Sequence, residues 1–201
     1  FIKQYENKPI PIANLTPLDR AKDISYESWT SKGGKRAKLA ASALAISKDC
    51  ADAYSILAEG ETGIEESLKL YKEGVKAGKR ALGAELHEFA GHFWIATPTR
   101  PYMRARQGVA ECLYALGKHE EAARSFREML ELNPNDNQGV RYSLLNCLLE
   151  QGDFAKAGEL IGKYDDDASA AWAYSKALIA FKEEGGSLNA KNLLLEAFKE
   201  N

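Results

Sequence analysis

The residues best suited to chemistry are two histidines and a glutamate in the stretch HEFAGHFW, residues 87–94. A zinc-protease helix places its histidine ligands at positions i and i+4, because about 100° of rotation per residue then leaves both on one face. His87 and His92 stand at i and i+5, so on a regular helix they would diverge by about 140°. Gly91 also indicates that a helix would end before His92. This spacing argues against a zinc protease and favours polar residues of a solvated insertion.

A phosphate-binding loop is the second chemistry to consider, at SKGGKRAK in residues 31–38. The position of that motif's first glycine is held by Trp29, and Arg36 stands where the motif needs Ser or Thr. A glycine turn followed by a basic helix start explains the stretch better. The sequence also has no GxSxG nucleophile elbow and no GxGxxG dinucleotide motif. We therefore expect no catalytic residue, no metal and no cofactor.

Composition points to a soluble cytoplasmic protein. Lys and Arg total 27 and Asp and Glu total 29, a net charge of −2, which gives no field for attracting nucleic acid or an acidic membrane. Cys50, Cys112 and Cys147 are far apart and form no CxxC pair, as expected of buried thiols in a reducing compartment. No apolar run is long enough to span a membrane. The chain starts without methionine and ends in a helical pattern, so we expect a piece of a longer protein.

Two internal repeats predict the elements that position these side chains. Residues 102–136 read as an amphipathic helix, a turn at Gly117, and a second helix carrying Ala122, Phe126 and Met129. The same order recurs in residues 140–166. The period of roughly 34 residues and the small residue in each second helix resemble the tetratricopeptide repeat (TPR) family. Both units depart from it at one place, because Arg106 and Arg141 stand where that family commonly has tryptophan.

Weaker helical pairs flank the two strong repeats. Thr16 and Pro17 suit the cap and first position of an early helix, and Trp172 stands at the first-helix aromatic position of the last pair. We therefore expect an all-α fold, a right-handed α-α superhelix or TPR-like solenoid of about five helical pairs. The predicted organisation is an extended N-terminal arm at 1–13 and a repeat domain at 14–201 with an insertion at 83–100.

A second resemblance covers residues 35–180. The segments KRAKLAASALAISKDCADAYSILAE, YMRARQGVAECLYALGK and KYDD are similar to the suppression-of-tumorigenicity family and to related bacterial TPR proteins. This resemblance implies a TPR-like scaffold and carries no catalytic residue to this chain.

A partner-binding groove is the expected functional surface, because the first helices of a TPR stack line its concave face. The candidate residues are Arg104, Gln107, Glu111, Tyr114, Tyr142, Ser143, Asn146, Tyr174 and Phe181. Such a mixed aromatic and polar strip suits an extended peptide or a helix. The alternative is that some of these aromatics pack between repeats. Asn146 matches one position of a C-terminal carboxylate clamp, but the clamp lysines are absent.

The insertion at 83–100 is long for a connection between helices, and its Phe89, Phe93 and Trp94 argue against disorder. We expect GHFW to fold back over a repeat edge, with His92 and Arg100 near the mouth of the groove. Together with Trp94 they are the candidate functional residues of the insertion. A purely structural plug is the alternative.

Three functional hypotheses follow. The first is a non-catalytic scaffold that binds a protein or peptide partner in its groove. The second is a metal-dependent or enzymatic site in the insertion, built on His87, Glu88 and His92. The third is a homo-oligomer formed through terminal repeats that lack a polar cap.

Overall fold

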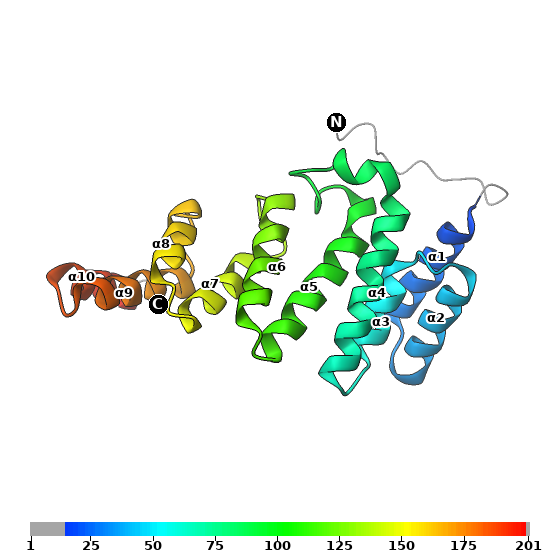
Figure 1. Ribbon diagram of the computed structural model, residues 1–201, viewed down its shortest axis with the longest axis horizontal. Coiled ribbons are helices and arrows are strands. Elements are labelled where there is room, and N and C mark those ends of the chain that lie inside the picture. The colour runs from blue at the N-terminus through cyan, green and yellow to red at the C-terminus, as the bar shows by residue number, and fades with distance from the viewer. Residues whose placement is uncertain (1–14, 200–201) are drawn as a thin grey trace. The chain divides into compact units, whose positions relative to one another are not determined.

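The computed structural model describes residues 15–199, so the predicted arm at 1–13 lies outside the described residues. Over this range ten α-helices follow one another without a strand, in the order shown in Figure 1. Their bounds are α1 (Pro17–Thr30), α2 (Gly33–Ile46), α3 (Ala51–Glu59), α4 (Ile64–Leu82), α5 (Arg100–Ala115), α6 (His119–Leu132), α7 (Val140–Glu150), α8 (Phe154–Lys163), α9 (Ala170–Glu184) and α10 (Leu188–Lys199). The predicted all-α architecture of five helical pairs is confirmed.

Helix α1 begins where its capping residue predicts. The Thr16 side chain accepts a hydrogen bond from the Asp19 backbone N–H at 3.1 Å, and the Asp19 carboxylate accepts one from the Thr16 N–H at 3.0 Å. This reciprocal capping box satisfies two N–H groups that a helix start leaves without partners. Pro17 occupies the first turn, where its missing N–H costs nothing.

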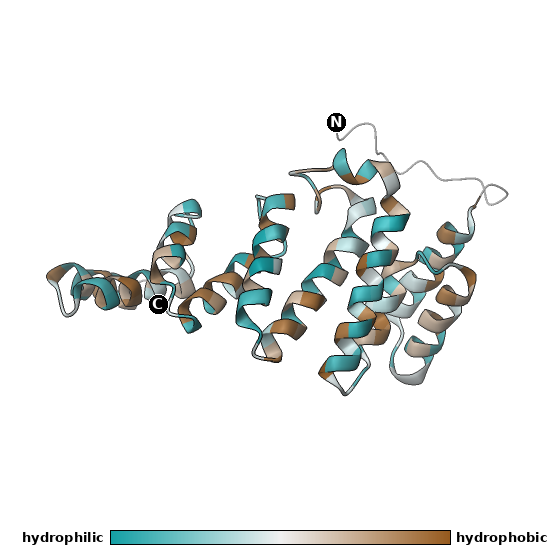
Figure 2. Ribbon diagram, in the orientation of Figure 1, coloured by the Kyte–Doolittle hydropathy of each residue, from teal (hydrophilic) through white to brown (hydrophobic). Residues whose placement is uncertain are grey.

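The described part of the chain divides into two compact units, unit 1 up to Val140 and unit 2 from Arg141 onward. In unit 1 the pairs α1–α2, α3–α4 and α5–α6 pack as hairpins, and the first helices α1, α3 and α5 lie next to one another. In unit 2, α9 packs against both α8 and α10. Apolar and polar residues alternate along most helices, which gives each helix one face for the core (Figure 2).

The register of the strong repeat is as predicted. Ala122, Phe126 and Met129 on α6 are all buried, with 0%, 1% and 1% of their surface exposed. Because they recur at i, i+4 and i+7, they form one stripe that faces α5.

Helices α4 and α5 approach each other closely because glycines lie at their contact. A β-carbon placed on Gly78 would lie 2.8 Å from Cβ and 3.0 Å from Cα of Tyr102. One placed on Gly74 would lie 3.1 Å from Cβ of Ala105. On the other helix, a β-carbon on Gly108 would overlap the Tyr71 ring at 2.2 Å. The absence of a β-carbon at Gly78 and Gly108 therefore lets α4 and α5 lie this close.

The insertion consists of two short 3-10 helices, η3 (Gly83–His87) and η4 (Thr97–Thr99), joined by turns. Phe89 and Phe93 are fully buried, and the Phe93 N–H donates a 3.2 Å hydrogen bond to the carbonyl of Leu132 at the end of α6. The Phe93 ring also lies 5.9 Å from that of Tyr102. The segment therefore folds back onto the α5–α6 pair through its aromatic residues.

Candidate functional site

A row of polar side chains on α5 forms the first candidate surface. Arg104 makes a two-point ion pair with Asp52 of α3, with Nε–Oδ1 and Nη2–Oδ2 distances of 2.8 Å each. The Asp52 side chain is 8% exposed and that of Arg104 is 30% exposed. A carboxylate this buried requires a charged partner, so Arg104 holds α5 against α3.

An aromatic ring from α1 completes this arrangement. The guanidinium of Arg104 lies 5.8 Å from the centre of the Trp29 ring, and that of Arg36 from α2 lies 5.1 Å from it. Arg36 in turn forms an ion pair with Glu59 at the end of α3. We call these five residues, Trp29, Arg36, Asp52, Glu59 and Arg104, the Trp29 cluster. Its two arginines are each paired with a carboxylate, so the cluster is close to neutral.

A polar row continues along α5 from the cluster. The Gln107 amide donates to the Glu111 carboxylate at 2.8 Å and accepts from Gln138 at 2.7 Å. Glu111 is exposed, while Tyr114 is half-buried with its ring edge-on to His119 at 5.1 Å. Arg104, Gln107 and Glu111 recur at i, i+3 and i+7, which places them on one face of α5. We refer to these three residues as the α5 row.

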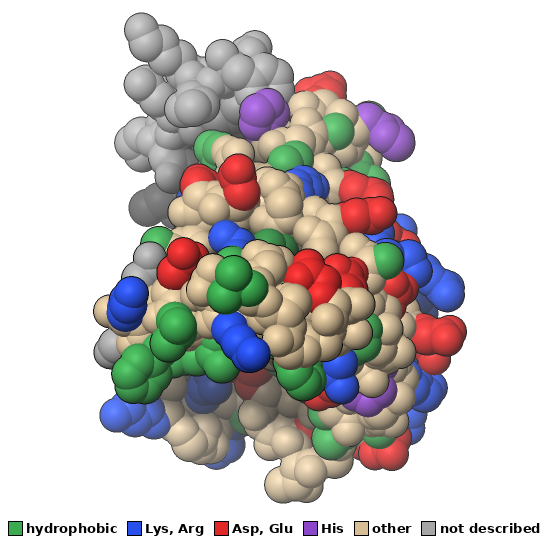
Figure 3. Space-filling model, turned by 90° about the vertical axis from the view of Figure 1, so that its left-hand side faces the viewer, with side chains coloured by type: hydrophobic (Ala, Val, Ile, Leu, Met, Phe, Trp, Pro, Cys, Tyr) green, Lys and Arg blue, Asp and Glu red, His purple; other side chains and the backbone are tan. Residues whose placement is uncertain are grey.

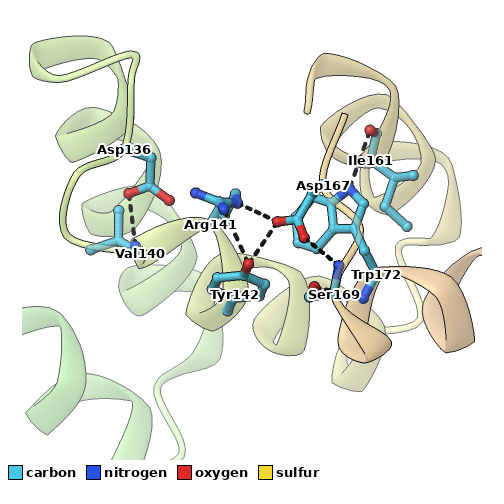
Figure 4. Close-up of polar contacts among 8 residues, drawn as sticks. All are labelled: Asp136, Val140, Arg141, Tyr142, Ile161, Asp167, Ser169 and Trp172. Atoms are coloured by element: carbon cyan, nitrogen blue, oxygen red, sulfur yellow. Dashed lines mark hydrogen bonds and ion pairs between the residues drawn. The ribbon is translucent and has the colours of Figure 1, made fainter. Parts of the chain in front are cut away.

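In unit 2 the predicted groove residue Tyr142 belongs to an internal network, shown in Figure 4. Its hydroxyl donates to the Asp167 carboxylate at 2.7 Å, and Arg141 Nε donates to the same oxygen at 2.8 Å. The Arg141 guanidinium lies 4.6 Å from the centre of the Tyr142 ring and 5.9 Å from that of Trp172. Tyr164 adds a third ring 5.4 Å from the guanidinium. These residues, Arg141, Tyr142, Tyr164, Asp167 and Trp172, form the Arg141 cluster.

The Asp167 side chain is only 5% exposed. Burial alone would favour its neutral form, but hydrogen bonds from Ser169, Tyr142 and Arg141 outweigh burial and hold the pKa of Asp167 well below its usual range. The carboxylate is therefore ionised at neutral pH and tied to α7 and to the start of α9.

The remaining predicted groove residues of unit 2 are more accessible. Ser143 is half-buried and Asn146 is exposed on α7, while Tyr174 and Phe181 are exposed on α9. An apolar groove between α9 and α10 is lined by Tyr174, Phe181 and Leu194 among others. Figure 3 shows hydrophobic side chains exposed over this end of the molecule. Self-assembly through the terminal repeats stays a prediction.

The candidate residues of the insertion are held by local contacts. Arg100 Nε donates to the Trp94 carbonyl at 2.9 Å, and its guanidinium lies 5.7 Å from the centre of the Trp94 ring. His92 is exposed, and Gly91 before it has a φ of 82°, so no helix carries both histidines. Across residues 15–199, His, Cys, Asp and Glu side chains form no group of three that could hold a metal ion.

The three cysteines are free and buried. Burial raises the pKa of each thiol, that of Cys147 to about 11, so all three are protonated at neutral pH. In the described part of the chain, no helix combines the length and apolarity needed to cross a membrane.

Reasoning from the sequence missed Trp29, Asp52 and Asp167. A signal existed for Asp52, because it is an acidic residue within ADAYSILAE, where most residues are apolar or small. For Asp167 the run YDDD offered three equivalent aspartates, and only packing selects one.

Comparison with known proteins agrees with both resemblances. A family model described as ST7 protein matches residues 12–191. The cattle protein named suppressor of tumorigenicity 7 protein-like is 33% identical over 175 residues, which cover 82% of this chain and 31% of the cattle protein. The ST7 homolog of Drosophila melanogaster is 32% identical over 170 residues, covering 78% of this chain and 31% of the fly protein. The chain thus spans about a third of the length of these curated relatives.

A solved structure shares the fold. YrrB, described as a TPR protein with an unusual peptide-binding site, superimposes with a TM-score of 0.64 at 16% sequence identity. The alignment covers 100% of this chain and 90% of YrrB. The predicted TPR-like α-α superhelix is therefore confirmed.

Proposed function

The chain belongs to the ST7 protein family, and from this membership and its TPR-type fold we propose that it is a non-catalytic scaffold that binds a peptide or helix of a partner protein. YrrB, which shares the fold, is described as having a peptide-binding site.

The α5 row is the observation that carries the proposal. Asp52 and Gln138 fix Arg104 and Gln107 in position, and the row ends on the exposed carboxylate of Glu111. Side chains that are already ordered lose little conformational entropy when a partner binds. Amide and carboxylate groups can pair with the backbone N–H groups of an extended peptide, and Trp29 adds an aromatic surface nearby.

In unit 2, Asn146 and Tyr174 offer the same types of group on α7 and α9. Asn146 stands about one repeat period of ~34 residues after Glu111, so the two occupy equivalent places on their first helices. We assign Glu111 to the binding surface of unit 1 and Asn146 to that of unit 2. Arg104 and Tyr142 contribute mainly by positioning, because their polar groups already bind Asp52 and Asp167.

A peptide-display selection tests the proposal without knowledge of the natural partner. The full chain is used to select binders from a random peptide library, and their dissociation constants are then measured with Glu111→Ala, Asn146→Ala and Tyr174→Ala variants. We expect these substitutions of exposed residues to weaken binding of the selected peptides by roughly tenfold or more, about 1–2 kcal/mol. The melting temperature should stay unchanged.

The matched controls are Arg127→Ala on α6 and Glu159→Ala on α8, which are equally exposed residues of second helices. These variants are expected to bind the selected peptides like the wild type. Selection of no specific binder, or peptides that lose affinity only with the second-helix controls, would contradict a site on the first helices.

A further inference from the structure

Unit 1 carries a groove that lies apart from the α5 row. It has a volume of about 660 Å³ and is lined by α4, α5 and α6. On α5 its lining residues are Tyr102, Arg106 and Val109, whereas the α5 row uses Arg104, Gln107 and Glu111. The two surfaces share no residue, so a ligand of this groove would be independent of the proposed function. We call it the lysine groove after its most prominent rim.

One rim of the lysine groove is a row of lysines on α4. They are Lys69, Lys72, Lys76 and Lys79. Their spacing of i, i+3, i+7 and i+10 places them on one face of the helix. Lys69 pairs with Glu66, and Lys76 pairs with Glu73, each at 2.7 Å. Among the described residues, Lys72 and Lys79 have no acidic partner, which leaves two uncompensated positive charges on the rim.

The floor and the opposite rim have a different character. Val75, Val109 and the buried Tyr102 supply an apolar floor. The α6 rim contributes Ser125 and Glu128, and the Glu128 carboxylate is already bound by Arg106. The groove is therefore apolar at its base and basic along one side only.

We propose that the lysine groove binds an acidic, amphipathic helix of a partner protein. An apolar stripe on that helix would cover Val75 and Val109, and carboxylates along one flank would meet Lys72 and Lys79. Lys72 and Lys79 are two helical turns apart, about 10.5 Å at 1.5 Å per residue. Acidic residues at i and i+7 of a helix lying alongside α4 match this distance.

A concave groove with an apolar floor favours a protein helix over a membrane surface. Anionic lipid headgroups present a flat layer, which would reach the exposed lysine tips but leave Val75 and Val109 on the floor uncovered. A helix fills both parts at once, because its apolar stripe and its charged flank lie side by side.

The experiment uses a fluorescent, alanine-rich helical peptide with glutamates at i and i+7 and leucines on the adjoining face. Its dissociation constant with the full chain is measured by fluorescence anisotropy at low and high salt. We expect Lys72→Glu with Lys79→Glu to weaken binding by roughly tenfold or more, and salt to weaken binding to the wild type. Lys72→Arg with Lys79→Arg keeps both charges and should retain binding.

The matched control is Lys32→Glu with Lys38→Glu, two exposed lysines of the same unit that lie outside the groove and give the same change in net charge. It should bind the peptide like the wild type, and a peptide with lysines in place of the glutamates should not bind. Equal losses in the two glutamate variants would overturn the proposal. A second result would also overturn it: the chain binds phosphatidylserine vesicles but not the peptide, and Lys72→Glu with Lys79→Glu abolishes the vesicle binding.

Discussion

The α4–α5 contact in unit 1 and the Arg141 cluster in unit 2 both join helices of successive pairs, but by different physical means. In unit 1 the joint is steric, because Gly78 and Gly108 let each helix receive an aromatic side chain of the other. In unit 2 the joint is polar, because Arg141 and Tyr142 of α7 converge on Asp167, which also binds the start of α9. A repeat fold can therefore keep its geometry while the chemistry of its joints changes.

The two arginines that replace the usual TPR tryptophan show the same contrast. Arg106 stays within its own helical pair, where it binds Glu128 of α6 and lies 5.7 Å from the Tyr102 ring. Arg141 reaches the segment before α9 and contacts three aromatic rings. At equivalent repeat positions, Arg106 therefore stabilises its own helical pair, whereas Arg141 connects its pair to the next helical pair.

Removal of Asp167 is expected to have the largest effect. Asp167→Ala removes the buried carboxylate that both Arg141, whose side chain is 20% exposed, and Tyr142 bind. Loss of one partner from a largely buried ion pair typically costs about 3–5 kcal/mol. Urea unfolding followed by hydrogen exchange should show that unit 2 loses stability while α1 to α6 keep their protection. The exposed Asp49–Arg80 pair is the control, and Asp49→Ala should cost at most about 1 kcal/mol. Equal effects of the two substitutions would contradict a structural role for the Arg141 cluster.

Gly78→Ala tests the steric joint. The new methyl group would meet Cα and Cβ of Tyr102, which side-chain rotation cannot move away. Overpacking of this kind costs about 1–3 kcal/mol, and the loss should appear as faster hydrogen exchange in α4 and α5. An unchanged melting temperature would show that these helices separate without cost.

Gly158→Ala is the opposite case and should stabilise the protein. Gly158 lies within α8, and a β-carbon there would meet no atom within 4 Å. Alanine favours a helix interior over glycine by about 0.5–1 kcal/mol. A rise in melting temperature of a few degrees would confirm it, whereas a fall would mean that Gly158 makes a contact that needs glycine.

Lowering the pH from 7 to 4 should change the stabilisation by Asp167 least of all. The pKa of Asp167 is lowered on folding, so its contribution to stability is complete above the unfolded value of about 3.9. The contribution is lost only as the pH falls through the lower folded value. The difference in urea midpoint between the wild type and Asp167→Asn should therefore be constant down to about pH 4 and shrink below it. A difference that already shrinks near pH 6 would show that the pKa of Asp167 is not lowered.

The amino-acid sequence by itself determined the helices, their pairing and the family. Helical periodicity is a local property, so the buried stripe of Ala122, Phe126 and Met129 could be read from their spacing alone. The cap at Thr16 and the failure of His87 and His92 to share a helix follow from equally short-range geometry.

Only the tertiary structure decided which polar side chains face solvent and which face each other. Arg104 and Tyr142 stand at first-helix positions that suit a groove, yet each is tied to an aspartate that the spacing does not reveal. Asp52 lies 52 residues before Arg104, and Asp167 lies 26 residues after Arg141. Such partners depend on how closely two helices pack and on which rotamer reaches across, and a local pattern contains neither quantity.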